Sequence, residues 1–402
     1  MHELTLLSVF FVVIGFIGLN VLSYYANKKN VFPDVIWVLL AGLLYGYLSQ
    51  QPSFGLPVIK LNVSLILYLF VPILIFASSQ KLCLFHFKDV ILPAGLNASI
   101  GVLISMVLIA LPIHFLFSVP LLLALMFGVI VSATDPLAIA ALLSRNKKIS
   151  ESRKLLFEGE SIFNDGFVVT IFGVLYAVIY EYKSFDIASS SFHLFTNIVG
   201  ALVIGAILGR LARWLIKFWQ GDYFTLRMNM TIALAFGSFL LSEYFHFSGI
   251  LGVFAAALAY GYKPNHDDKN IKSQRSVWEY LEYLMNAGLF FLLGASVSSL
   301  AMYEGIEFTH VIVAISLVFL SRFFSLLMLW PITYIKQQRL TKEEFWLMNF
   351  AGARGAVSIA LLLLLPDNSE FKDFFLSIAF IMIIFTLVIY PFLTQKILNK
   401  RS

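Results

Sequence analysis

Long apolar stretches recur along the whole chain and are separated by short polar segments. About 20 apolar residues cross the hydrocarbon core of a bilayer as a helix. By this measure the pattern predicts an all-α polytopic membrane protein with thirteen membrane-spanning helices. The predicted spans are 4–22, 31–49, 61–79, 90–117, 121–143, 155–180, 193–216, 226–245, 248–262, 277–301, 308–335, 344–365 and 371–395.

The composition narrows the class of protein further. Only 13% of the residues are charged and 60% are hydrophobic, whereas a soluble domain carries about 25% charged residues. The basic residues lie in loops, so we expect no nucleic acid as a partner. No nucleotide-binding GxxxxGK[ST] motif occurs, and the histidines and the single cysteine form no metal or nucleophile set. We therefore expect neither an enzyme nor a nucleotide-driven pump.

The Lys and Arg residues divide unequally between the two sides of the predicted spans. Of the 28, 23 lie in alternate loops, in the span ends next to those loops or in the C-terminal tail, and only Lys60, Lys183 and Lys372 lie in the loops between. Because cytoplasmic loops carry the excess of positive charge, this predicts an N-terminus outside and a C-terminus in the cytoplasm. Thirteen spans also permit two inverted repeats of six helices and a linker.

The predicted sixth span carries a carboxylate near its centre. Asp165 is ten residues beyond Leu155, or about 15 Å at 1.5 Å per residue, which is half the hydrocarbon thickness. An ionised carboxylate at that depth costs roughly 2.5–3.5 kcal/mol, so we expect it to bind a cation, a proton, or both in turn. Helical spacing places it on one polar stripe with Glu158, Glu160, Ser161 and Asn164.

The predicted fifth span contains a second intramembrane acid, Asp135, followed directly by Pro136. Proline removes a backbone donor and crowds the preceding turn. Carbonyl groups freed near Thr134 are then candidate cation ligands, because irregular backbone at this depth is tolerated only inside protein or beside water. A simple proline kink capped by Thr134 and Asp135 is the alternative.

The predicted twelfth span carries Arg354 near its centre, between Gly352 and Gly355. A buried guanidinium requires a carboxylate partner. We expect that partner to be Glu160, with Asp135 or Asp165 as alternatives. The glycines favour close helix approach or local unwinding. Arg322, in the eleventh span, is expected either to reach the membrane surface or to cap another carboxylate.

Three segments together resemble the signatures of the monovalent cation:proton antiporters of the NhaP/NHE type, a family of sodium/proton exchangers. They are SATDP at 132–136, FEGESIFNDG at 157–166 and GARGAVSIAL at 352–361, in the family's order and spacing. Segments 238–261 and 278–294 resemble the family too. The resemblance implies crossed, discontinuous fifth and twelfth helices. It also implies a core bundle of about 90–180 and 308–397, and an interface bundle of about 1–80 and 193–301.

The resemblance also implies a function and roles for individual residues. The chain would exchange Na⁺, or Li⁺ or K⁺, for H⁺ across the cell inner membrane as a homodimer, with no resident cofactor. In the family that the chain resembles, an asparagine directly before the key aspartate, as at Asn164 here, is associated with electroneutral one-for-one exchange. Asp165 would bind cation and proton in turn, Asp135, Thr134 and Ser161 would complete the Na⁺ site, and Glu160, Arg354 and Asn164 would support it.

One departure from the family's sequence pattern leaves the identity of the transported ion undecided. The third span of many relatives carries a glutamate where this chain has Ala77. A K⁺-selective exchanger is therefore an alternative, as are a transport-inactive membrane sensor and a cation channel, although no TVGYG-like filter is present. The pH set-point and the direction of flux are also left open by the sequence.

Overall fold

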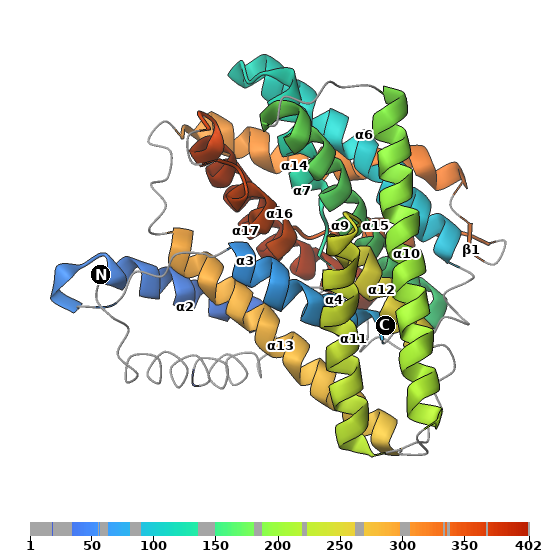
Figure 1. The fold of residues 1–402 in the computed structure, drawn as a ribbon. Coiled ribbons are helices and arrows are strands. Elements are labelled where there is room, and N and C mark those ends of the chain that lie inside the picture. Colours follow the sequence, from blue (N-terminus) through green and yellow to red (C-terminus); the bar gives the residue numbers. More distant parts are fainter. Residues whose placement is uncertain are drawn as a thin grey trace.

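The computed structural model describes most of the chain beyond the first predicted span (Figure 1). The described residues are 34–54, 63–80, 90–135, 149–180, 187–218, 223–261, 269–297, 306–332, 334–335, 338–366 and 369–400, with residues 18 and 56. Span 4–22, apart from residue 18, and Pro136 in the fifth span lie outside them. The predictions made for those segments therefore stay predictions.

The described residues are almost entirely helical. The helices of the first half are α2 (Asp34–Ser49), α3 (Val63–Leu65), a π-helical turn (Ile66–Phe70), α4 (Val71–Ser79), α6 (Ile91–Phe117), α7 (Leu121–Ser132) and α9 (Glu151–Tyr180). Those of the second half are α10 (Ile187–Phe218), α11 (Phe224–Tyr244), α12 (Gly249–Tyr260), α13 (Lys269–Val297), α14 (Phe308–Leu329), α15 (Lys342–Ala351), α16 (Ala356–Leu363) and α17 (Lys372–Lys400). Two short strands, β1 (Tyr334–Ile335) and β2 (Gln338–Arg339), pair antiparallel.

Helix length and composition agree with a protein that crosses a membrane several times. Six of the described helices are long and apolar enough to span a bilayer, and four shorter apolar helices accompany them. The helical, multi-pass prediction is thus confirmed for the described part of the chain. The arrangement of thirteen helices in two inverted repeats stays a prediction.

The described helices pack in two groups, which meet along α9. In the first, which we call the α9 group, α6, α7 and α9 pack together, α14 lies against α6, and α17 contacts α14, α15 and α16. In the second, the α12 group, α2 packs on α13, α4 lies between α12 and α13, and α10 and α11 contact α12. Helix α9 contacts α4, α10 and α12, so the helix that carries Asp165 lies at the boundary.

Helices α10 and α12, both in the α12 group, approach each other closely at glycines. A Cβ on Gly205 or Gly209 of α10 would collide with the backbone oxygens of Gly252 and Ala256 on α12. Since lipid tails are as apolar as leucine, close van der Waals packing, and not exclusion from water, drives such helix association. These glycines therefore fix how closely α10 lies against α12.

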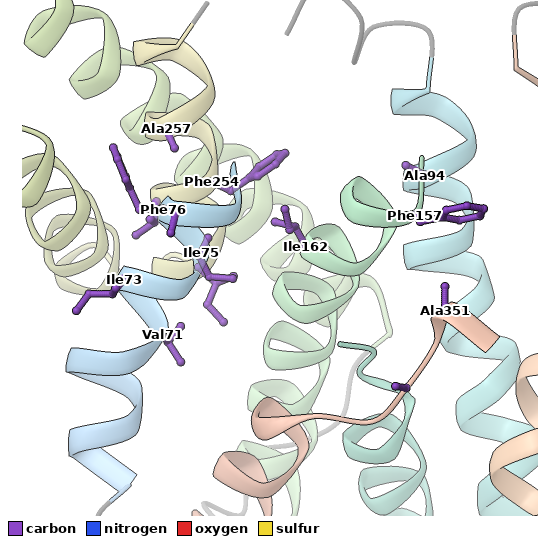
Figure 2. Close-up of a cluster of buried hydrophobic side chains, with 14 of the residues drawn as sticks. Val71, Ile73, Ile75, Phe76, Ala94, Phe157, Ile162, Phe254, Ala257 and Ala351 are labelled. Atoms are coloured by element: carbon purple, nitrogen blue, oxygen red, sulfur yellow. The ribbon is translucent and has the colours of Figure 1, made fainter. Parts of the chain in front are cut away.

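Buried apolar side chains fill the boundary between the two groups. Figure 2 shows Phe76 of α4 beside Phe254 of α12, with Ile162 of α9 close to Phe254. The rings of Phe163 and Phe254 have centroids 4.9 Å apart in an edge-to-face arrangement, which aromatic pairs prefer. On α9 this boundary is one turn or less from Asp165.

Candidate functional site

The end of one helix meets the break between two others where the sequence predicts the site. Helix α7 ends at Ser132, and the chain continues to Asp135 without helical structure. Likewise α15 ends at Ala351 and α16 begins at Ala356, so the predicted twelfth span is discontinuous. The Asp135 backbone N–H donates to the carbonyl of Ala353 across 2.7 Å, and these two residues form an isolated antiparallel bridge. We call this meeting point the crossing.

Side chains from two other segments bind the carbonyl groups that follow α7. Arg354 Nη1 donates to the Ser132 oxygen (3.1 Å) and the Ala133 oxygen (3.3 Å). Asn164 Nδ2 also donates to the Ser132 oxygen, across 3.2 Å. The last four carbonyls of a helix have no partner within it, and positive charge is favourable at that end of the helix dipole. The Arg354 guanidinium therefore acts as a charged C-terminal cap of α7.

Two serines extend the same pattern. Ser161 donates a short hydrogen bond to the Thr134 oxygen, and Ser358 Oγ donates to the Ile130 oxygen across 2.8 Å. Ser358 was not predicted, although its place one turn beyond Arg354, within the GARGAVSIAL segment, was a usable signal. Thr386 of α17, which accepts the Arg354 backbone N–H at 3.0 Å, had no comparable signal in the sequence.

The expected ion pair between Glu160 and Arg354 is wrong, because Glu160 pairs with Arg322 of α14. Arg322 Nη1 lies 2.8 Å from Glu160 Oε1, and Nη2 lies 2.6 Å from Oε2. Both side chains are only 3% exposed. This fork geometry, with two parallel charge-assisted bonds, is the strong form of an arginine–carboxylate contact.

The reason for the different pairing lies in the space around the arginines. A Cβ at Gly352 would lie 2.9 Å from Arg322 Nε and 3.3 Å from Thr134 Cγ2. Because glycine has no Cβ, the Arg322 guanidinium passes beside the unwound segment and reaches Glu160. Arg354 is then left for the α7 carbonyls. The alternative role for Arg322, capping a carboxylate, is thereby confirmed.

The remaining predicted site residues lie together at the crossing. Ser161 and Asn164 contact the chain between Ser132 and Thr134, and Asp165 follows Ser161 by one turn on α9. Asp165 also lies within electrostatic range of Asp135 and Glu160. The structure therefore brings Asp165, on α9, within electrostatic range of Asp135, in the non-helical segment after α7.

Side chains with oxygen atoms lie next to these two aspartates in the sequence or one turn away on the same helix. Both aspartates are partly exposed, whereas Thr134, Ser161 and Asn164 are at most 2% exposed. Thr134 Oγ1 and Asn164 Oδ1 are buried with no hydrogen-bond partner among the described residues. Buried polar atoms rarely remain unpaired, and carboxylate, hydroxyl and carbonyl oxygens are the ligands that hard cations prefer. The arrangement is thus chemically suited to a small cation.

A resident metal centre is a different kind of site. No group of three or more His, Cys, Asp or Glu side chains is placed to hold a metal ion in the part of the chain that the structure describes. The candidate cation ligands are therefore two carboxylates supplemented by neutral oxygens.

The structure also shows the surroundings of Ala77, the residue at which many relatives carry a glutamate. Ala77, on α4, is completely buried in the apolar cluster that α4 forms with α12 and α13. Next to it, the rings of Phe76 and Trp278 lie 4.6 Å apart. An apolar residue thus fills the position at which the sequence analysis expected a glutamate.

The chain has clear relatives of known name. It matches the sequence model of the family described as "Sodium/hydrogen exchanger, transmembrane" over residues 6–400. The Na⁺/H⁺ antiporter NhaH of Halobacillus aidingensis is 27% identical over 412 residues, which cover 98% of each chain. The Na⁺/H⁺ antiporter NhaP of Pseudomonas aeruginosa is 26% identical over 407 residues, covering 94% of this chain and 93% of the relative.

A solved structure agrees with these matches. The sodium proton antiporter MjNhaP1 from Methanocaldococcus jannaschii superimposes with a TM-score of 0.77 over 97% of this chain and 99% of that one, at 22% sequence identity. At that identity the likeness shows the fold alone. Taken with the family match, which spans nearly the whole sequence, it establishes that the chain belongs to the sodium/hydrogen exchanger family.

Proposed function

We propose that the protein is a secondary antiporter that exchanges one Na⁺ for one H⁺ across the cell membrane, with Asp165 as the carboxylate that both ions use. Two of its relatives are named Na⁺/H⁺ antiporters. The observation that carries the proposal is that Asp165 lies within electrostatic range of Asp135 at the crossing, where the buried side-chain oxygens of Thr134 and Asn164 have no hydrogen-bond partner among the described residues. A carboxylate held inside a membrane protein is costly unless its charge is used.

The buried charges support one-for-one exchange. Asp165 lies within electrostatic range of Asp135 and Glu160, and Arg354 lies within range of Arg322 and Glu160. These five groups are three carboxylates and two guanidinium groups. With all five ionised, the group carries a net charge of −1. One Na⁺ or one proton brings it to zero. A site neutralised equally by either ion moves no net charge when it carries one ion each way, which is electroneutral exchange.

The same arithmetic suggests how coupling arises. The α9 group would move past the α12 group only with the site neutralised, since an uncompensated charge is expensive to carry across a bilayer. Na⁺ and H⁺ then compete for Asp165, and each must leave before the other binds. The boundary that would slide is the apolar contact that α9 makes with α12 and α4.

The residue at position 77 bears on the choice of ion. Buried Ala77 supplies no oxygen, so the cation ligands would come from the crossing alone. A K⁺ or Li⁺ preference is the second candidate on this ground. A screen of Na⁺, Li⁺ and K⁺ against an imposed pH gradient in proteoliposomes separates these alternatives and also distinguishes an exchanger from an inactive sensor.

The decisive experiment replaces the shared carboxylate. Asp165→Asn should abolish the dissipation of a pH gradient by Na⁺ while the purified protein still folds. Asp373→Asn, an exposed acid in the first turn of α17, is the matched control and should retain exchange. Rates that do not change when valinomycin and K⁺ clamp the potential would support electroneutrality. Full Na⁺ flux in Asp165→Asn would contradict the proposal.

Two further features belong to this proposal. By likeness to its family the protein would act as a homodimer. The protein would be a multi-pass protein of the inner membrane. The distribution of its Lys and Arg residues would place its C-terminus on the cytoplasmic side. Protease accessibility of a C-terminal tag in sealed vesicles of known orientation tests the orientation of the C-terminus. A mass measurement of the purified protein in detergent tests whether it is a dimer.

A further inference from the structure

The glycine at position 355 is not required by the backbone conformation. Gly355 caps the N-terminus of α16 with φ −131° and ψ −161°, an extended conformation that residues with side chains adopt freely. Gly352, the other glycine of the segment, has φ −84° and ψ 47°. The reason for a glycine at position 355 is therefore to be sought in the space around it.

That space is filled by Asp135. A Cβ on Gly355 would lie 2.4 Å from Asp135 Cβ, 2.5 Å from its Oδ2 and 2.8 Å from its Cγ, whereas ordinary van der Waals contact begins at 3.4 Å. The Asp135 backbone is held by its hydrogen bond to Ala353. Because Cβ is fixed to the backbone, a rotation of the Asp135 side chain cannot relieve this clash. Asp135 would have to shift by about 1 Å together with its carboxylate.

We propose that Gly355 is a positioning residue that sets the place of the Asp135 carboxylate relative to Asp165, and thereby the preference of the site among alkali ions. The inference rests on the proposed function, in which Asp135 and Asp165 share the cation. Selectivity among these ions depends on the size of the site and the field strength of its oxygens. A ligand shifted by about 1 Å alters both.

The two glycines of this segment thus have separate tasks. Gly352 leaves room for Arg322 and so supports the ion pair with Glu160. Gly355 leaves room for Asp135 and so bears on the cation itself. A substitution at position 355 should change ion preference as well as stability, while one at position 352 should act on stability through the pair of Arg322 and Glu160.

Gly355→Ala tests the proposal in proteoliposomes. A misplacement of about 1 Å can change rates up to a hundredfold, so we expect the apparent KM for Na⁺ to rise roughly tenfold or more. We also expect the ratio of the Li⁺ and Na⁺ KM values to change, with a smaller effect on the maximal rate. Gly173→Ala, on the same helix as Asp165 but with open space around it, is the control and should behave as the parent protein. Unchanged KM values and ion ratios, or an equal loss of maximal rate for every ion, would overturn the inference.

A stability measurement shows whether the effect acts through Asp135. Gly355→Ala should lower the midpoint of thermal unfolding in the parent protein but not in an Asp135→Gly background, where the clashing side chain, including its Cβ, is gone. An equal decrease in both backgrounds would contradict the proposed contact. If Asp165→Asn abolishes exchange while Gly355→Ala leaves ion preference intact, only this inference fails. If Asp165→Asn retains exchange, the proposed function itself fails.

Discussion

Arg322 and Glu160 form a two-pronged ion pair between α14 and α9, although 162 residues separate them in the sequence. The pair neutralises one of the three acids near the crossing and leaves Arg354 to bind the carbonyls at the end of α7. Each arginine thus has a different task. One compensates a carboxylate, and the other caps the C-terminal end of α7.

Removing Arg322 should destabilise the protein strongly. Arg322→Met leaves Glu160 as a buried, uncompensated charge, and breaking one partner of such a pair costs about 3–5 kcal/mol. We expect a clearly lower midpoint of thermal unfolding in detergent. Arg210→Met, at an exposed position of α10, should have little effect. A combined Glu160→Gln and Arg322→Met variant should recover most of the loss, because replacing both partners removes the unpaired charge. A double variant as unstable as the single one would refute this account.

Asn164→Asp should destabilise the region after α7 and should not simply add a second ion-binding acid. The Asn164 amide donates to the Ser132 oxygen, whereas an ionised carboxylate only accepts hydrogen bonds. Two acceptors would then face each other in a buried position, at a cost of about 1–3 kcal/mol. Thermal unfolding at neutral pH measures the effect. Asn164→Gln, which keeps the donor, is the control, and unaltered stability of Asn164→Asp would argue against the contact.

Linking α9 to α12 should stop exchange. In a Cys83→Ala background, cysteines at Phe163 and Phe254 should react with a short reversible bis-methanethiosulfonate, since the two rings lie 4.9 Å apart. Because the proposed motion slides these helices past each other, transport should stop and then return on reduction.

A second pair of cysteines is the matched control for this experiment. Tyr45 and Phe291, whose rings lie 5.6 Å apart, join α2 to α13 inside the α12 group. The link between them should leave exchange intact. Undiminished exchange in the fully linked Phe163–Phe254 variant would exclude sliding at this boundary.

Two glycine substitutions should have opposite effects on stability. Gly205→Val places side-chain atoms against the Gly252 carbonyl and the α12 backbone, so overpacking should cost about 1–3 kcal/mol. Gly237→Ala, on α11 with open space around it, should gain about 0.5–1 kcal/mol, because alanine is the better helix residue. Thermal unfolding of both variants checks the pair. A stabilising Gly205→Val would contradict the close packing of α10 on α12.

The local features of the site follow from the sequence. Helical periodicity alone aligns Ser161, Asn164 and Asp165 on α9, because neighbours on a helix face are set by 3.6 residues per turn. The paired glycines around Arg354 indicate an interruption, and the length of the apolar stretches indicates a membrane protein. Each of these properties is decided within one segment, so no knowledge of the partner segment is needed.

The partners across segments were decided only by the tertiary structure. The predicted spans offer several acids and arginines, and helical spacing does not say which of them meet. The sequence therefore assigned Glu160 to Arg354, whereas the fold pairs it with Arg322. In the same way, the sequence predicts only that Gly355 allows close helix approach or local unwinding, and the fold places it against the Asp135 side chain. Such contacts depend on where helices far apart in the chain cross and on the space that a missing Cβ leaves. These are properties of packing, and no single segment contains them.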